Sequence, residues 1–254
     1  MRFEDYKDRY HTIRMIREGG VLELAMHTRG GEAMWGTSLN SLHAELGQAF
    51  ADIARDRDNK VVIMTGTGDN FVTGYDPEEG PHETEMAALW QRVHEEGTAL
   101  LENLLAIPVP VIAAVNGPAY IHAEILVMAD IVLAADHAEF ADLAHVPGGV
   151  VPGDGVQTVW QMLLGPNRGR YFLLTGEKIG AEEARRLGIV GEVLPRDKVM
   201  DRAREHAHRL ARMPAHTLRQ TRSVLVRHMR RRLADELPHG LGVEALAALH
   251  NAGA

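Results

Sequence analysis

The chain of 254 residues contains no cysteine, few aromatic residues and no long apolar run. Without cysteine, the protein has no disulfide bonds, thiolate nucleophiles, zinc–thiolate sites or cysteine-ligated iron–sulfur clusters. No stretch approaches the roughly 20 apolar residues that a membrane span needs. The N-terminal MRFEDYKDRY lacks the apolar core of a signal peptide. We therefore expect a cytoplasmic protein without a membrane partner.

An excess of positive charge is also missing. Lys and Arg number 27 against 35 Asp and Glu, and the formal net charge is −8. Nucleic acids and acidic membrane surfaces attract basic proteins, so neither is expected as a partner. What is present is an ordinary globular composition, 45% hydrophobic and 24% charged, in a chain long enough to bury a sizeable core.

Strands and helices alternate through most of the chain. Apolar alternation predicts a β-hairpin over residues 11–27, and apolar steps of three and four residues predict a helix from Leu39 to Ile53 with Thr37 or Ser38 as N-cap. Buried strands are predicted at 61–64, 111–115, 131–135 and 189–194, and further helices at 83–106, 121–129, 156–164, 168–174 and 181–188. This alternation predicts an α/β fold of βαβ type.

The C-terminal part differs in character. From Arg196 onward the sequence contains three helical runs and no strand signal, with breaks predicted at Met213–Pro214 and Leu237–Pro238. We therefore expect an α/β core over residues 1–195, followed by a helical C-terminal region over residues 196–254.

Four groups able to move or steer protons lie between Val115 and Gly155, namely His122, Glu124, His145 and Asp154. The last two fall in a Gly/Pro-rich segment, where sharp turns deliver side chains into clefts. Spacing alone favours a buried structural His145 with Asp154 as a turn residue. The loop 65–76, TGTGDNFVTGYD, contains neither GxxxxGK[ST] nor GxGxxG, and the histidines lack a metal-binding spacing. No cofactor or metal is therefore expected.

A resemblance to the crotonase (enoyl-CoA hydratase/isomerase) superfamily is carried by four segments. They are VVIMTGTGDNFVTGYD, PVIAAVNGPAYIHAEILVMADIVLAADHAEF, GVVPGDG and GPNRGRYFLLTGEKIGAEEARRLGIVGEV. The resemblance extends from about residue 10 to the C-terminal helices. It implies a spiral of ββα repeats, with a helical C-terminal region that mediates trimer formation, and many members pair trimers into hexamers.

The sequence departs from the hydratases of this superfamily at the expected active site. They stabilise an oxyanion with two backbone N–H groups, one of which corresponds here to the amide of Tyr75. The Gly-Gly-Gly run that supplies the other is replaced by Tyr120–Ile121–His122–Ala123. Of the two hydratase glutamates, Glu124 matches the first, whereas His145 stands at the second and Asp154 where a small residue is usual. A plain hydratase is therefore not expected.

These departures resemble a narrower branch, the β-diketone hydrolases of the 6-oxocamphor hydrolase type. The matching residues are His122, His145, Asp154, Glu244 and Trp35. The resemblance implies hydrolysis of a carbon–carbon bond in a cyclic or bicyclic 1,3-diketone, a desymmetrising retro-Claisen reaction that yields a keto acid and needs no cofactor. The implied partners are this small-molecule diketone and further copies of the chain, as a trimer or hexamer.

The resemblance also implies roles for single residues. His145 is the base that activates water, because histidine titrates near neutrality, and Asp154 holds its other ring nitrogen and fixes the tautomer. His122 polarises the substrate carbonyl and then donates to the oxyanion. Glu244 relays a proton or orients water, and it belongs either to its own active site or to a neighbouring subunit's.

Three residues are candidates for substrate binding. The indole N–H of Trp35 is suited to hold the second carbonyl. Tyr75 enters through its backbone amide, and Glu124 is either an active carboxylate or a structural one. The VTGYD motif is nearer to the acyl-CoA enzymes than to the diketone branch, which leaves open some remaining CoA-site character.

Two alternatives remain at the level of sequence. The first is a crotonase-type enzyme acting on acyl-CoA thioesters as a hydratase, isomerase, hydrolase or dehalogenase, in which Asp154 is the nucleophile or His145 the base. The second is a non-catalytic RNA-binding or scaffold protein with the same fold. The net negative charge and the cluster of polar residues count against this second alternative.

Overall fold

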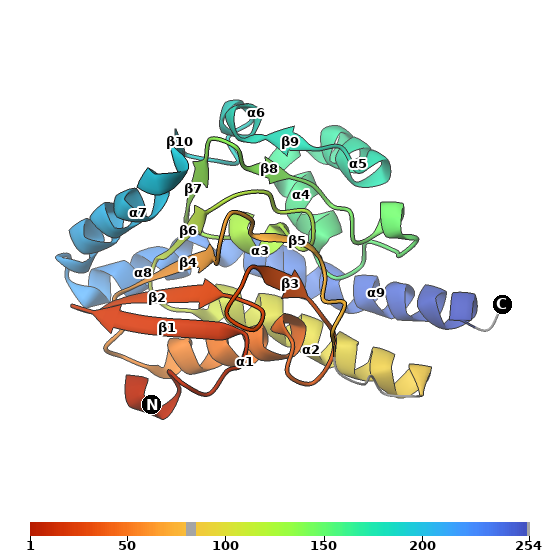
Figure 1. Cartoon of the computed structure of the whole chain (residues 1–254), viewed down its shortest axis with the longest axis horizontal. Helices are drawn as coiled ribbons and strands as arrows, with labels where there is room; N and C mark the ends of the chain where they lie inside the picture. Colours follow the sequence, from red (N-terminus) through yellow and green to blue (C-terminus); the bar gives the residue numbers. More distant parts are fainter. Residues whose placement is uncertain (80–84, 253–254) are drawn as a thin grey trace.

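The computed structural model describes residues 1–79 and 85–252. Six strands of the described chain form the main sheet, in the order β1-β2-β4-β6-β7-β10 (Figure 1). They are β1 (Ile13–Glu18), β2 (Val21–Met26), β4 (Val61–Gly66), β6 (Val111–Val115), β7 (Ile131–Ala135) and β10 (Glu192–Leu194). The β1–β2 hairpin is antiparallel, as predicted, and the other pairings are parallel. The α/β fold class is confirmed.

The central strands β4 and β6 are almost entirely buried and consist mainly of apolar residues. Every residue of β6 is buried, as are the first five residues of β4, which is the usual pattern of parallel strands packed between helices. One helix, α7 (Arg196–Ala211), packs against β4, β6 and β7. On the other side, α1 (Leu42–Arg55) packs along α2 (Met86–Ala106) and contacts β1 and β3.

Two pairs of short strands lie outside the main sheet. β3 (Ala33–Trp35) runs parallel to β5 (Val72–Tyr75), and β8 (Glu139–Phe140) runs antiparallel to β9 (Ile179–Gly180). The register of the first pair places Trp35 directly beside Tyr75, two of the predicted site residues. The remaining short elements are η1 (Phe3–Asp5), η2 (Val146–Gly148), α4 (Val156–Leu164), α5 (Pro166–Thr175) and α6 (Ala181–Arg186).

Several element boundaries differ from the predictions. The first helix begins at Leu42 with Ser41 as N-cap, because a turn in which the Ser41 hydroxyl donates to the Ser38 carbonyl (2.7 Å) precedes it. The helix predicted over 121–129 is reduced to α3 (Glu124–Val127), because His122 has a φ of +52° that an α-helix does not accommodate. The predicted strand 189–194 is paired only from Glu192. Part of the helix predicted over 83–106 falls on residues 80–84, outside the described residues.

The last part of the chain is helical, as expected, but one predicted break is wrong. The break at Met213–Pro214 is present, and α8 (Ala215–Leu225) follows it. The second break lies at Val226, and Pro238 stands inside α9 (Arg227–Ala252). The buried side chains of Leu237 and Leu241 on either side of the proline pack into the core. This packing keeps the helix intact despite the one backbone N–H that proline lacks.

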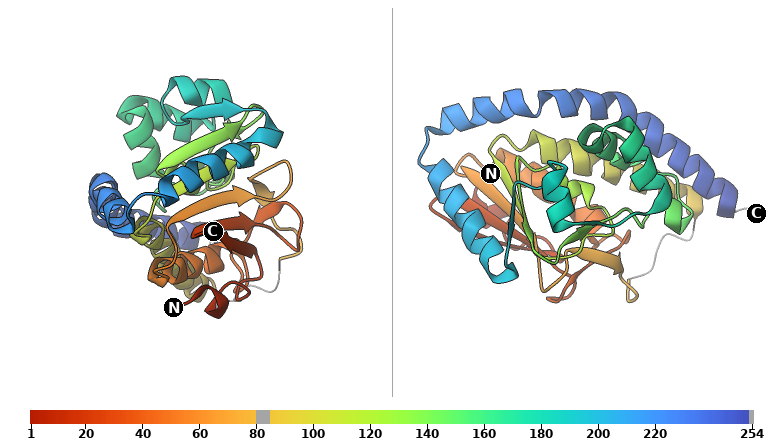
Figure 2. Two further views of the ribbon diagram at one scale, coloured as in Figure 1. Left: turned by 90° about the vertical axis from the view of Figure 1, so that its left-hand side faces the viewer. Right: turned by 90° about the horizontal axis from the view of Figure 1, so that it is seen from above.

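Helix α9 returns to the α/β core and packs along α2 and against α4 (Figure 2). Its partner α8 is anchored by the side chain of Arg222, which is 1% exposed. The guanidinium donates to the Asp130 carboxylate (2.7 Å) and to the Leu105 carbonyl (3.1 Å) at the end of α2. A cation at the C-terminal end of a helix satisfies carbonyls that have no partner within the helix.

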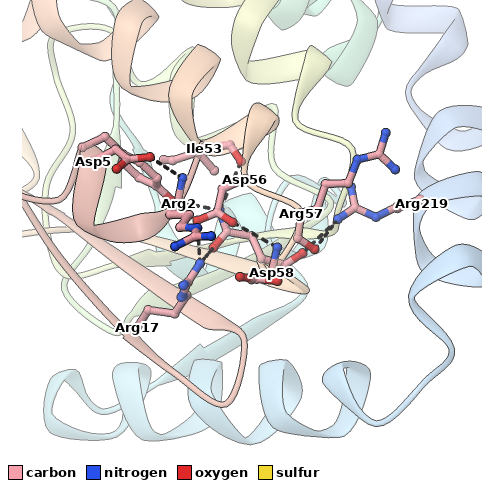
Figure 3. A network of polar contacts seen from close by, with 10 residues as sticks. Arg2, Asp5, Arg17, Ile53, Asp56, Arg57, Asp58 and Arg219 are labelled. Carbon is pink, nitrogen blue, oxygen red and sulfur yellow. Dashed lines mark hydrogen bonds and ion pairs between the residues drawn. The ribbon is translucent and has the colours of Figure 1, made fainter.

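A second polar network joins the N-terminal residues, β1, the end of α1 and α8 (Figure 3). At its centre is the buried Asp56, which accepts hydrogen bonds from Arg17 (2.6 Å) and from the hydroxyl of Tyr6 (3.0 Å). Arg219 reaches across from α8 to the carbonyl of Arg57 (3.0 Å).

Among the described helices, none has the length and hydropathy required to cross a membrane.

Candidate active site

A cavity of about 200 Å³ lies where β3, β5, α1, α2, α9 and the segment 144–154 meet. One end of it is polar and the rest is an apolar wall. The polar end is formed by His43, His122, His145, Asp154 and Glu244, and the wall by Trp35, Leu89, Trp90, Val93, Val150 and Leu241. Six of the seven predicted site residues line this cavity, since Tyr75 is there as well and only Glu124 is not.

His145 is held between two carboxylates. Its Nδ1 lies 2.7 Å from Oδ1 of Asp142, and its Nε2 lies 3.3 Å from Oδ1 of Asp154. The Asp142 and His145 side chains are 2% and 3% exposed, so this ion pair is shielded from water. Nδ1 of His145, the ring nitrogen that points away from Asp154, therefore contacts Asp142, a residue that was not predicted from the sequence. Only the three-residue spacing of Asp142 and His145 in one loop was available as a signal.

The protonation of His145 differs from the sequence-based expectation. Burial by itself lowers the pKa of His145, but the charge of Asp154 and the hydrogen bond to Asp142 outweigh it and raise the pKa well above 6.5. The imidazolium is therefore the predominant form near neutral pH. It is a ready acid, and its basic form becomes more abundant as the pH rises.

Asp154 lies between the imidazoles of His122 and His145. Its Oδ1 faces Nε2 of His145, and its Oδ2 lies 3.0 Å from Nδ1 of His122. Burial alone raises the pKa of this carboxyl, but the charges of His145 and His122 lower it well below its ordinary value. Asp154 is therefore an ionised carboxylate that is already engaged on both oxygens.

His122 occupies a backbone conformation that usually belongs to glycine. Its φ is +52°, a left-handed value that non-glycine residues rarely adopt and that tends to occur at functional sites. Its Nδ1 lies 2.9 Å from Oε1 of Glu124 and 3.0 Å from Asp154. Although burial opposes it, these two charges raise the pKa of His122 to about 10. Because Nδ1 is shared by two carboxylates, Nε2–H is the donor available to a bound molecule.

The neighbours of His122 hold its ring in place. The ring centroids of His122 and Trp35 are 4.0 Å apart with an interplanar angle of 31°. Glu124 is 2% exposed and stands behind the imidazole. Burial raises the pKa of Glu124, while the charge of His122 opposes that shift. Glu124 thus contacts the imidazole of His122 but does not line the cavity.

Glu244 enters the cavity of its own chain from helix α9. Glu244 is 6% exposed, and its Oε2 has no hydrogen-bond partner among the described residues. Burial and the charge of Asp154 raise the pKa of Glu244 to about 8. Glu244 is therefore a largely neutral acid near pH 7, with one buried oxygen free to bind a further molecule.

A third histidine of the cavity was not predicted from the sequence. His43, on α1, lies edge-on to Trp35 with ring centroids 5.8 Å apart, and its Nδ1 is 2.8 Å from Oε2 of Glu96. Arg92 bonds to the same Glu96 carboxylate and also donates to the carbonyl of Thr37 (2.7 Å). Sequence reasoning had no signal for His43, because a histidine within an amphipathic helix is usually a surface residue.

Two sets of three side chains have possible ligand atoms within 4.8 Å of one another. They are His122, Glu124 and Asp154, and His145, Asp154 and Glu244. In the first set, Nδ1 of His122 already lies at hydrogen-bond distance from both carboxylates, which is the arrangement of an imidazolium. The second set retains the unpartnered Oε2 of Glu244 and is the better candidate for holding a cation.

Comparisons with known proteins agree with this architecture. The sequence profile of the family described as enoyl-CoA hydratase/isomerase matches residues 19–244. Carnitinyl-CoA dehydratase from Shigella flexneri is 32% identical over 201 residues, covering 78% of this chain and 74% of that protein.

Two solved structures are similar over nearly the whole chain. A β-diketone hydrolase from the cyanobacterium Anabaena sp. PCC 7120, bound to (S)-3-oxocyclohexyl acetic acid, has a TM-score of 0.90 and 42% identity, covering 96% of each chain. An enoyl-CoA hydratase/isomerase from Mycobacterium paratuberculosis has a TM-score of 0.81 and 26% identity, covering 95% of each chain.

Proposed function

We propose that this chain, which belongs to the enoyl-CoA hydratase/isomerase family, hydrolyses a carbon–carbon bond of a cyclic or bicyclic 1,3-diketone. The observation that carries the proposal is the sharing of Asp154 between two imidazoles, His122 and His145, at the end of a small apolar cavity. One imidazole is backed by Asp142 and faces the position of a hydrolytic water, and the other is a fixed cationic donor.

The ligand of the Anabaena hydrolase suggests the class of substrate. It carries a ring ketone and an acetic acid group. In bicyclo[2.2.2]octane-2,6-dione, one bridgehead carbon is bonded to both carbonyl carbons. Hydrolysis of the bond between this bridgehead carbon and one carbonyl carbon yields such a keto acid. The cavity of about 200 Å³ is below the roughly 300–1,000 Å³ of drug-sized sites, which favours a small diketone.

The first step is the attack of water on one carbonyl carbon. Neutral His145 takes a proton from water at Nε2, and the hydroxide oxygen bonds to that carbon. The developing oxyanion accepts a hydrogen bond from Nε2–H of His122, whose positive charge strengthens the interaction. A single donor of this kind contributes on the order of 10²–10³ in rate. The free Oε2 of Glu244 is placed to orient the attacking water.

The second step breaks the carbon–carbon bond. The tetrahedral intermediate collapses to a carboxylic acid, and the bonding electron pair moves onto the carbon between the two former carbonyls. It delocalises onto the second carbonyl as an enolate, to which the indole N–H of Trp35 donates. The imidazolium of His145 then returns its proton to carbon, so one water is consumed and one keto acid is formed. The carboxylic acid group releases its proton to solvent.

The acyl-CoA alternative is less well supported. Both oxygens of Asp154 face imidazoles, and its pKa is lowered well below its ordinary value, so this carboxylate is a poor nucleophile. In addition, the rings of His122 and Trp35 lie against each other in the cavity, with centroids 4.0 Å apart. This arrangement suits a compact ring better than a long thioester.

We extend the proposal to assembly and location. Several large apolar side chains of α8 and α9 are exposed on the single chain, namely Val224, Leu225, Val243, Leu246 and Leu249. Exposed apolar patches of this kind are usual at protein–protein contacts. They support a homotrimer or hexamer, and we place the enzyme in the cytoplasm.

Parallel turnover assays test the proposed function. Bicyclo[2.2.2]octane-2,6-dione and crotonyl-CoA are offered to the wild-type protein, to His145→Ala and to His206→Gln. The last is a matched control, because His206 also pairs with a carboxylate (Glu192, 2.7 Å) but lies on α7, outside the cavity. We expect the diketone to give a keto acid with wild type and His206→Gln only. Turnover of the thioester alone would contradict the proposal.

A further inference from the structure

We propose that His145, Asp154 and Glu244 form a binding site for a divalent transition-metal ion of the zinc class, and that its occupation shuts off the active site. Each of the three residues offers one ligand atom, an imidazole nitrogen or a carboxylate oxygen, and these atoms lie within 4.8 Å of one another. The inhibition rests on the proposed function, whereas the binding does not.

The spacing of two ligand atoms already matches a metal site. Zinc binds nitrogen and carboxylate oxygen at about 2.0–2.2 Å, so two ligands of a tetrahedron lie about 3.4 Å apart. Nε2 of His145 and Oδ1 of Asp154 are separated by 3.3 Å. The ligand atom of Glu244 lies within 4.8 Å of the other two ligand atoms, and all three residues line the cavity, which leaves a fourth position for water. Three protein ligands with one open position is the arrangement of catalytic zinc sites.

The third ligand is poised to bind. Glu244 is 6% exposed, and its Oε2 has no hydrogen-bond partner among the described residues. A buried oxygen of this kind carries a desolvation cost that a ligand relieves. Because a carboxylate oxygen of Glu244 lies within 4.8 Å of the ligand atoms of His145 and Asp154, one ion serves all three groups.

The surroundings of His145 resemble those of a metal-binding histidine. Its Nδ1 lies 2.7 Å from the buried Asp142, which leaves Nε2 as the coordinating atom. Histidines that bind metals almost always donate their other ring N–H to a carboxylate or carbonyl, which orients the ring and raises its basicity. Asp142 is thus in place to support metal binding by His145.

The charge balance also favours a cation. Four acidic side chains, those of Glu124, Asp142, Asp154 and Glu244, surround the imidazoles of His122 and His145, and the bound ion takes the place of the protons on Glu244 and His145, which are released to solvent. Among the described residues, neither Lys nor Arg lines the cavity. Imidazole and carboxylate ligands suit zinc and its neighbours, whereas magnesium and calcium prefer more oxygen ligands and several waters.

The site is tested by calorimetric titration of chelator-treated protein with Zn²⁺. The absorption spectrum of the protein with bound Co²⁺ shows whether the coordination is tetrahedral. We expect one ion per chain in wild type, an affinity at least about tenfold lower in Glu244→Gln and Asp154→Asn, and about 10–100-fold lower in Asp142→Asn. His206→Gln should bind as wild type does. Circular dichroism establishes that each variant is folded, and the Co²⁺ spectrum of wild type needs no variant at all.

The zinc titration, combined with assays of diketone turnover, distinguishes a failure of the metal site from a failure of the proposed function. Zinc that binds in a Glu244-dependent way and abolishes diketone turnover, with recovery on adding EDTA, supports both. Glu244-dependent binding without any diketone turnover by the free protein contradicts the proposed function and leaves the site standing. Binding that is unchanged in Glu244→Gln, or no stoichiometric binding to wild type, overturns the metal site.

Discussion

Gly153 and Gly240 meet backbone to backbone, so that a Cβ atom on either residue would overlap the carbonyl oxygen of the other. The first lies in the loop before α4, and the second lies in α9, one turn before Glu244. A Cβ on Gly153 would also lie 2.9 Å from Cβ of Glu244. This close approach allows α9 to bring its carboxylate next to Asp154.

Gly240→Ala is therefore expected to push α9 away from the loop. Overpacking of this kind destabilises by about 1–3 kcal/mol, and the displaced Glu244 lowers kcat as well. The matched control is Gly242→Ala on the same helix, where an added Cβ meets nothing within 4 Å. Alanine there should stabilise the helix by about 0.5–1 kcal/mol. Thermal unfolding of both variants checks this, and equal melting temperatures would contradict the proposed role of the glycine contact.

Asp142→Asn should shift the pH profile of the enzyme toward acid. Because the Asp142 hydrogen bond and charge help to raise the pKa of His145, removing the charge lowers that pKa and makes the basic form available at lower pH. In wild type, kcat/KM should rise with pH above neutrality, as the imidazolium loses its proton. In the variant this rise should occur at lower pH, and the maximal kcat/KM at high pH should be lower than in wild type by a factor of up to about 10⁴.

Rates measured from pH 5.5 to 10 in the presence of EDTA decide this point. Asp136→Asn serves as the control, because Asp136 lies near His137 on the surface. An unchanged acid limb in Asp142→Asn would show that His145 is not the group that limits activity at low pH.

Glu244→Gln should alter the pH dependence of stability in a defined direction. The pKa of Glu244 is raised from 4.5 to about 8 by burial, so between these values the folded state retains a proton that the unfolded chain has lost. This contribution to the free energy of unfolding is fully present below about pH 4.5 and is lost as the pH rises toward 8. Each pKa unit corresponds to about 1.4 kcal/mol.

The glutamine variant lacks this titration. Its melting temperature, measured relative to wild type, should therefore increase steadily from pH 5 to pH 8 and level off above that. A constant difference over the whole range would mean that Glu244 ionises normally in the folded protein.

His122→Asn should lower kcat without unfolding the protein. Asparagine tolerates the left-handed backbone that His122 adopts, but its shorter side chain does not present a cationic donor to the cavity. We expect kcat to fall by on the order of 10²–10³, with a smaller effect on KM. If kcat stays near the wild-type value, the oxyanion is stabilised by other groups.

Arg222→Met should destabilise the protein because it leaves Asp130 and the carbonyls at the end of α2 without their buried donor. Breaking a buried pair in this way costs about 3–5 kcal/mol. Denaturant titration checks this against Arg170→Met, since Arg170 is exposed on α5. Similar midpoints for the two variants would contradict the anchoring role of Arg222.

The sequence predicted the main sheet well because its signal is local. The runs at 61–64, 111–115 and 131–135 are continuous apolar stretches bounded by turn residues, and each forms a buried strand. The prediction failed where long-range packing overrides local preference. Pro238 is a strong breaker by itself, yet Leu237 and Leu241 carry α9 through it by packing into the core.

The sequence by itself determined the family, the positions of the core strands along the chain and the identity of most cavity residues, because motif spacing and hydrophobic pattern are properties of neighbouring positions. Only the tertiary structure decided that Asp142 holds Nδ1 of His145, that His43 lines the cavity, and that Glu244 lines the cavity of its own chain. It also decided the protonation of these groups. Hydrogen-bond partners and pKa shifts depend on burial and on distances between side chains from different elements, and no local pattern encodes those quantities.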